Sequence, residues 1–312
     1  MLCLSSLGPV PLRSRLVRFL AGISRPDAST DSDSSDSSQS GNSPFLNFGC
    51  VIHRPPGFGK TNFLQQLTTF CDLYSSREYN LPSSQSPHYK SYLVLSFDLS
   101  RFDVYPADTE FDGQNLHSRF QDFITRAVRD WAAKYAAEFD LEKLYVDIEQ
   151  DSLFELVTVL PLLTRHATLI LIDSYDSPLI SALPEHLSIV EGVVRDVLYR
   201  DVLENFACDR NSAIAGILIM GIGTHRKFRT FEGHRLIRDH STSDDFADAI
   251  GLTETDIMDV IKQAGVLQEE QEALFKSVVE NCQYGYFTDS EEGGVIYSSR
   301  EVVTRIISYL SS

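Results

Sequence analysis

Short runs of consecutive apolar residues alternate along the chain with longer segments in which apolar residues recur every three or four positions. A short continuous apolar run is typical of a buried strand, whereas the second pattern predicts an amphipathic helix. The predicted strands are 48–53, 92–97, 168–172 and 213–220. The predicted helices are 61–73, 116–135, 152–165, 187–206 and 254–263. Strands that alternate with helices predict an α/β fold, with a doubly wound parallel sheet flanked by helices.

Composition divides the chain into four parts. Residues 1–23 contain arginines and no acidic residue, a composition that overlaps with a mitochondrial presequence, although a short amphipathic helix explains it too. Residues 24–44 are rich in serine and aspartate and predict a disordered linker. Residues 45–240 form the alternating core, and residues 241–312 predict a mainly helical C-terminal subdomain, in which Thr253 and Asp256 resemble a capping box.

Charge and cysteine content limit the kinds of partner and cofactor that the chain is expected to bind. The chain has 27 basic and 44 acidic residues, a net charge of −17, which repels the phosphate backbone of nucleic acids. Its five cysteines have no CxxC spacing, so we expect neither a disulfide framework nor a zinc knuckle. Apolar runs stay far below the roughly 18 residues of a membrane span, and no membrane partner is expected. We expect an intracellular protein, cytoplasmic or nuclear, with mitochondrial targeting by residues 1–23 as the alternative.

The clearest chemistry lies between the first predicted strand and the first predicted helix, where residues 53–61 read HRPPGFGKT. A strand, a GK[ST] sequence and a helix are the context of a phosphate-binding loop of the Walker A kind. Lys60 would pair with the β- and γ-phosphates, while the Thr61 hydroxyl would bind Mg²⁺. The alternative is a glycine turn that caps an ordinary helix. The expected nucleotide-binding residues are Arg54, Pro55, Pro56, Gly57, Phe58, Gly59, Lys60, Thr61 and Asn62.

A second group of polar residues follows the later strands. Asp173 ends the apolar run TLILI, where a Walker B aspartate would orient Mg²⁺, and the neighbouring strands end at Asp98 and Gly221. Ser174 occupies the position of the carboxylate that aligns the attacking water. Asp176 could replace that carboxylate, or could form the turn before Ser177-Pro178. The expected catalytic residues are Lys60, Asp173 and Asp176, and the expected metal ligands are Thr61 and Asp173.

Five segments together carry a family resemblance. They read RPPGFGKT (54–61), YLVLSFDLS (92–100), LIDSYDSPL (171–179), IGLTETDI (250–257), and YGYF (284–287) followed by VIY (295–297). In this order they resemble the motifs of the AAA-ATPase-like family, P-loop ATPases that often precede a PD-(D/E)XK nuclease-like domain. The resemblance covers about residues 48–310 and makes Arg54 a normal first loop residue. It implies a P-loop NTPase fold of the additional-strand type with a helical C-terminal lid, binding ATP and Mg²⁺.

Three departures from that family bear on function. Ser174 stands where the family motif DEYD has its glutamate. Ser298-Ser299 replace an Asn-Pro pair, which we expect to be a neutral change in a turn. Third, the arginine-rich start and the serine/aspartate linker replace the N-terminal segment that usually precedes the loop. The nuclease-like domain is also expected to be missing, and neither the charge nor any visible catalytic group favours a nuclease.

Three functions remain open at this point. The first is an ATP-binding protein with weak or impaired Mg²⁺-dependent hydrolysis, and the second is a nucleotide-gated interaction module without turnover, which Ser174 favours. The third is a scaffold that no longer binds nucleotide. ATP is preferred to GTP because no NKxD motif is present. Arg226 and Arg229, in a basic cluster at 225–238, could reach a γ-phosphate or the site of a second copy, or could belong to a solvated charged loop. A homo-oligomer or a protein partner is therefore left open.

Overall fold

In the computed structural model, the described residues are 49–76, 88–107, 111–139, 153–204, 214–223, 237–242, 246, 249–286 and 295–311. The arginine-rich segment 1–23, the linker 24–44 and the two arginines Arg226 and Arg229 lie outside these residues. The expectations for them stay predictions.

The strand order of the main sheet decides the fold class. Its five strands are β1 (Gly49–His53), β2 (Leu93–Asp98), β3 (Thr168–Asp173), β4 (Ile214–Gly221) and β5 (Ile237–Asp239). They lie in the order β2-β3-β4-β1-β5, and β3 pairs in parallel with both β2 and β4. β4 is thus inserted between β1, which leads into the predicted loop, and β3, which ends at Asp173. An inserted strand at this place defines the additional-strand type, so the predicted α/β sheet flanked by helices is confirmed, while the C-terminal lid stays a prediction.

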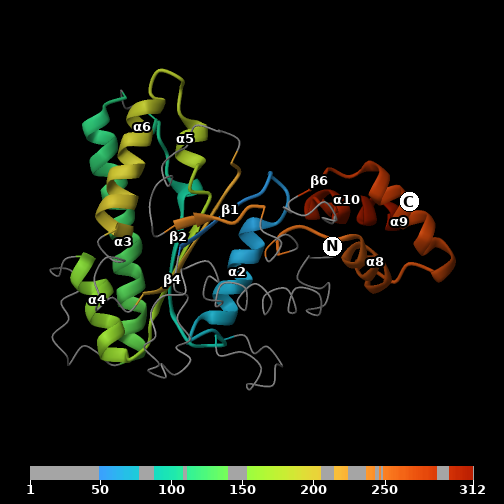
Figure 1. The fold of residues 1–312 in the computed structure, drawn as a ribbon, viewed down its shortest axis with the longest axis horizontal. Coiled ribbons are helices and arrows are strands. Elements are labelled where there is room, and N and C mark those ends of the chain that lie inside the picture. The colour runs from blue at the N-terminus through green and yellow to red at the C-terminus, as the bar shows by residue number, and fades with distance from the viewer. Residues whose placement is uncertain are drawn as a thin grey trace, which may run out of the picture. The chain divides into compact units, whose positions relative to one another are not determined.

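Helices occupy the connections between the strands. They are α2 (Lys60–Cys71), α3 (Gly113–Glu138), α4 (Leu153–Thr164), α5 (Ser177–Ser181), α6 (Leu187–Val194), α8 (Glu254–Gln263), α9 (Gln268–Asn281) and α10 (Ser299–Leu310), with a 3₁₀ turn, η3 (Leu99–Arg101), and a π-helical segment, η5 (Arg195–Glu204). α3 contacts β2, α4 and α6, and these helices gather on one side of β2 (Figure 1). None of the helices in the described ranges has the length and apolar character needed to cross a membrane.

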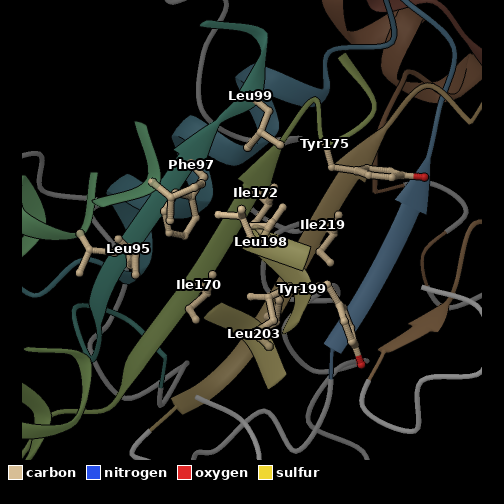
Figure 2. Packing of buried hydrophobic residues seen from close by; sticks show 14 of the residues in the cluster. Leu95, Phe97, Leu99, Ile170, Ile172, Tyr175, Leu198, Tyr199, Leu203 and Ile219 are labelled. Atoms are coloured by element: carbon tan, nitrogen blue, oxygen red, sulfur yellow. The ribbon is translucent and has the colours of Figure 1, made fainter. Parts of the chain in front are cut away.

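The buried side chains explain why the central strands are so apolar. Every residue of β3 is buried, because neighbouring strands and helices cover it on all sides. Figure 2 shows Ile170 and Ile172 of this strand beside Leu198 of the π-helical segment, and all three are inaccessible to solvent. Continuous apolar runs in the sequence therefore mark the strands that lie deepest in the sheet.

The C-terminal region has a smaller core of its own. β6 (Tyr284–Tyr286) and β7 (Val295–Tyr297) pair antiparallel, and β7 contacts α8. Ile257, Val278 and Val302 come from α8, α9 and α10 respectively and are buried in one apolar cluster. The capping box predicted at Thr253 and Asp256 is confirmed, since both of its hydrogen bonds are present.

The structure corrects the sequence prediction in three places. The predicted helix 187–206 is α-helical only to Val194 and continues as η5, because helical spacing of apolar residues does not separate i→i+4 from i→i+5 hydrogen bonding over a few turns. The strands β5, β6 and β7 were not expected, since three-residue strands leave too short an alternating pattern. Ser298 and Ser299 are not in a turn: Ser298 caps α10 and Ser299 is its first residue.

The chain forms two compact units. One comprises residues 52–67 and 239–312 of the described part, and the other comprises residues 68–238 with the start of β1. The predicted loop belongs to the first unit and the end of β3 to the second.

Candidate nucleotide-binding site

The connection from β1 to α2 has the backbone of an anion-binding loop. Gly57 and Gly59 have φ angles of 86° and 90°, a region that residues with a side chain rarely adopt. The first helical hydrogen bond runs from the Phe63 N–H to the Gly59 carbonyl at 2.9 Å, so α2 begins directly after the loop. The N–H groups at the start of a helix carry partial positive charge and face an anion bound there.

Arg54 supports this loop from the protein interior. Its side chain is completely buried, and its guanidinium donates hydrogen bonds to the carbonyls of His53 (2.8 Å), Ser241 (2.7 Å) and Phe246 (3.2 Å). A buried arginine is stabilised by acceptors in this way because the unsolvated charge would otherwise be costly. The residue that departs from the glycine consensus thus ties the loop to Ser241 and Phe246.

Lys60, the first residue of α2, closes the loop from the other end. Its ammonium donates to the carbonyls of Arg54 at 2.7 Å and Pro55 at 3.0 Å, and the side chain is buried. These contacts hold a positive charge against the loop backbone. Thr61 and Asn62 follow on the exposed side of the first turn.

Phe58 and the beginning of α10 hold the middle of the loop. Phe58 is buried, and the carbonyls of Gly57 and Phe58 accept hydrogen bonds from the first residues of α10. The donors are the Ser298 hydroxyl (3.3 Å), the Ser299 hydroxyl (3.1 Å) and the Arg300 N–H (3.0 Å). Sequence analysis missed these residues. The order Ser298-x-x-Glu301 could have indicated the start of a helix, but not its contact with a loop some 240 residues earlier.

The residue before Arg54 takes part in a polar cluster that is not a catalytic triad. Asp239 accepts from the Ser241 hydroxyl at 2.5 Å and lies 3.4 Å from Nδ1 of His53. The Ser241 hydroxyl lies 3.1 Å from the same Nδ1. A triad needs the carboxylate and the hydroxyl on opposite ring nitrogens, which excludes it here. Partial burial would raise the pKa of Asp239, but hydrogen bonds from His53 and Ser241 outweigh it and lower the pKa.

The carboxyl ends of β2 and β3 bring the predicted aspartates side by side. Asp98 and Asp173 are register partners, which confirms that polar groups gather at this edge of the sheet. Asp98 accepts from the Ser100 hydroxyl at 2.6 Å and pairs with Arg101 at 3.0 Å. Asp173 is buried.

Ser174 occupies an unusual backbone position directly after Asp173. Its φ is 53°, and its hydroxyl donates a long hydrogen bond of 3.4 Å to Oδ1 of Asp173. A residue with a side chain in the left-handed region is strained by about 1 kcal/mol. The chain therefore turns sharply here, and the position carries a hydroxyl instead of a carboxylate.

Asp176 is engaged with the backbone that follows β4. Its side chain is 1% exposed, and its Oδ2 accepts from the N–H groups of Ile222 at 2.7 Å and Gly223 at 2.9 Å. Its Oδ1 is also buried and has no hydrogen-bond partner among the described residues. Gly221 permits this packing, since a Cβ there would lie 2.9 Å from Oδ1 and would clash with the Tyr175 ring.

The hydrogen-bond donors at the loop suit an anionic ligand better than a metal ion held by a group of His, Cys, Asp and Glu side chains. An ammonium held at a loop of successive N–H groups is typical of phosphate binding. Within the described ranges, no three His, Cys, Asp or Glu side chains gather into a metal-binding group.

Fold and loop together define an α/β protein of the P-loop type. Residues 47–229, more than half of the chain, match the family AAA-ATPase-like, described as predicted AAA-ATPase, and the chain belongs to this family. No curated protein matches the sequence.

Proposed function

We propose that the chain binds ATP with Mg²⁺ at the loop formed by residues 54–61. The observation that carries this proposal is the position of the Lys60 ammonium, bound to two loop carbonyls beside glycines of positive φ. The N–H groups that start α2 would face the phosphates, and Lys60 would balance their charge.

The remaining ligands follow from side-chain chemistry. The Thr61 hydroxyl at the loop is a hard oxygen donor of the kind Mg²⁺ prefers, and so is the Asp173 carboxylate at the end of β3, so each is proposed as a metal ligand. When bound, Mg²⁺ supplies neutralisation of the phosphate charge. Because Arg54 is buried against carbonyls, we assign it a supporting role and leave direct phosphate contact to Lys60 and the loop backbone.

Slow or absent turnover is the second part of the proposal. Hydrolysis usually relies on a carboxylate beside the metal-binding aspartate to orient the attacking water, and Ser174 has no carboxylate. Asp176, the substitute considered above, is buried and accepts two backbone N–H groups. We therefore propose that Asp176 braces the segment after β4 and that the protein works as a nucleotide-binding module with little hydrolysis.

Calorimetry with Mg·ATP tests the binding proposal, with phosphate release followed in parallel. Wild type should bind, and Lys60→Ala should weaken binding by about 100-fold, because a charge-assisted contact with phosphate is lost. Lys276→Ala is the control, since Lys276 is an exposed lysine of α9 in the same compact unit. Absence of binding by the wild type would leave the scaffold as the surviving hypothesis.

A further inference from the structure

The contacts between α10 and the loop determine the direction of the loop's donors. In a trans peptide, the carbonyl of one residue and the N–H of the next point in opposite directions. The carbonyls of Gly57 and Phe58 are directed at α10 by three hydrogen bonds. The N–H groups of Phe58 and Gly59 therefore point away from α10.

The first half of the loop has no such donors to offer. Lys60 binds the carbonyls of Arg54 and Pro55, but the residues that follow those carbonyls are Pro55 and Pro56, which have no N–H. The anion-binding donors therefore begin at Gly57, in the part of the loop that α10 holds.

Close packing shows that this contact is built into both partners. A Cβ on Gly57 would lie 2.9 Å from the Ser298 hydroxyl oxygen, and one on Gly59 would lie 3.4 Å from that of Ser299. Ser298 is also the N-cap of α10, since its oxygen accepts from the Glu301 N–H. The Ser299 hydroxyl, by contrast, donates to the Phe58 carbonyl and has no capping role. A substitution of Ser299 therefore removes the contact with the loop and leaves the helix cap in place.

We propose that Ser299 and the Arg300 N–H are positioning groups of the nucleotide site, which orient the loop donors through the carbonyls of Phe58 and Gly57. This inference rests on the proposed ATP binding and adds a coupling to it. Binding free energies are linked reciprocally. If the docked α10 raises the affinity for nucleotide, bound nucleotide must stabilise the docking of α10 by the same free energy.

The first experiment compares Ser299→Ala with Ser308→Ala in the full chain. Ser308 also lies on α10, but its hydroxyl donates to Thr304 inside the helix. Amide hydrogen exchange without nucleotide should become several-fold faster at Phe58 and Gly59 in Ser299→Ala only. Mg·ATP affinity should fall by about 3- to 10-fold, the effect of one hydrogen bond, and Ser299→Thr should restore it. If Ser299→Ala does not fold, Ser299→Cys, which keeps the size but is a weak donor, takes its place.

A second pair of variants isolates the backbone contact. Proline is tolerated in the first turn of a helix but removes the N–H, so Arg300→Pro should weaken Mg·ATP binding several-fold relative to Arg300→Ala, which keeps the N–H. In wild type, Mg·ATP should slow exchange of the Arg300 amide, and Lys60→Ala should abolish this slowing.

The outcomes separate the two proposals. Equal loop exchange in Ser299→Ala and Ser308→Ala would overturn the positioning role, whether or not ATP binds. Faster loop exchange in Ser299→Ala, together with a wild type that does not bind Mg·ATP, would support the positioning of the loop and contradict the proposed function.

Discussion

The loop after β1 and the connection after β3 are both turns from a strand toward a helix, yet they are held in different ways. The loop is held through its backbone carbonyls by Lys60 and the start of α10, while the Arg54 guanidinium bonds to carbonyls outside the loop. After β3 the side chains themselves are engaged, since Asp176 is buried and bonded to the backbone after β4. This difference supports the proposed function, in which nucleotide binding rests on the loop and hydrolysis would need a carboxylate that Ser174 does not supply.

The largest expected effect is on stability, from Arg54→Ala. Removing the guanidinium leaves buried carbonyls without a donor and opens a cavity, so we expect the free energy of unfolding to fall by about 3–5 kcal/mol. Chemical denaturation would measure it. Arg101→Ala, which removes a side chain that is 79% exposed, should change stability by less than about 0.5 kcal/mol. Equal effects of the two substitutions would show that Arg54 does not support the loop.

The next effect separates the two roles considered for Asp176. Asp176→Ala leaves the N–H groups of Ile222 and Gly223 without an acceptor and should lower the free energy of unfolding by about 2–3 kcal/mol. Asp176→Asn keeps an acceptor and should lower it by about 1 kcal/mol. Denaturation and phosphate release are measured on both variants. A large loss of phosphate release in Asp176→Asn at nearly unchanged stability would instead identify Asp176 as the residue that orients water.

Ser174→Glu would sharpen the comparison by restoring a carboxylate after Asp173. If the missing carboxylate limits hydrolysis, phosphate release should rise at least about tenfold, or 1.4 kcal/mol of transition-state stabilisation, with Mg·ATP affinity little changed. Ser174→Gly is the matched control, because it should relieve the strain at φ 53° and stabilise the fold by about 0.5–1 kcal/mol without raising turnover. A Ser174→Glu protein as slow as wild type would mean that more than this carboxylate is missing.

The smallest expected effect concerns pH and the base of the loop. Because the folded-state pKa of Asp239 is lowered, its contribution is present above the unfolded pKa of about 4 and is lost as pH falls toward the folded pKa. Its side chain is 59% exposed, so the contribution is screened and should be about 0.5 kcal/mol. Asp239→Asn should therefore lower the free energy of unfolding at pH 7 and match wild type near pH 2. An equal difference at both pH values would exclude an ionic origin.

The sequence predicted the central strands because burial on every side requires continuous apolar runs, as in β3. It also predicted the loop, since strand, GK[ST] and helix are adjacent in the chain. The contacts of Ser299 and Arg54 could not be predicted, because hydroxyl and guanidinium groups pair with carbonyls whose identity depends on the fold. The burial of Asp176 was missed for the same reason: an aspartate before Ser-Pro reads as a turn whether it faces solvent or the backbone after β4.

The hydrogen bond from Ser298 to Gly57 joins residues 241 positions apart. A ribosome therefore makes the loop well before it makes the residues of α10 that contact it. Because domains generally fold as units, a partly made chain without α10 also lacks the donors that bind the carbonyls of Gly57 and Phe58. If Ser299 and Arg300 position the loop as proposed, a chain in which α10 has not yet docked would bind nucleotide more weakly than the folded protein.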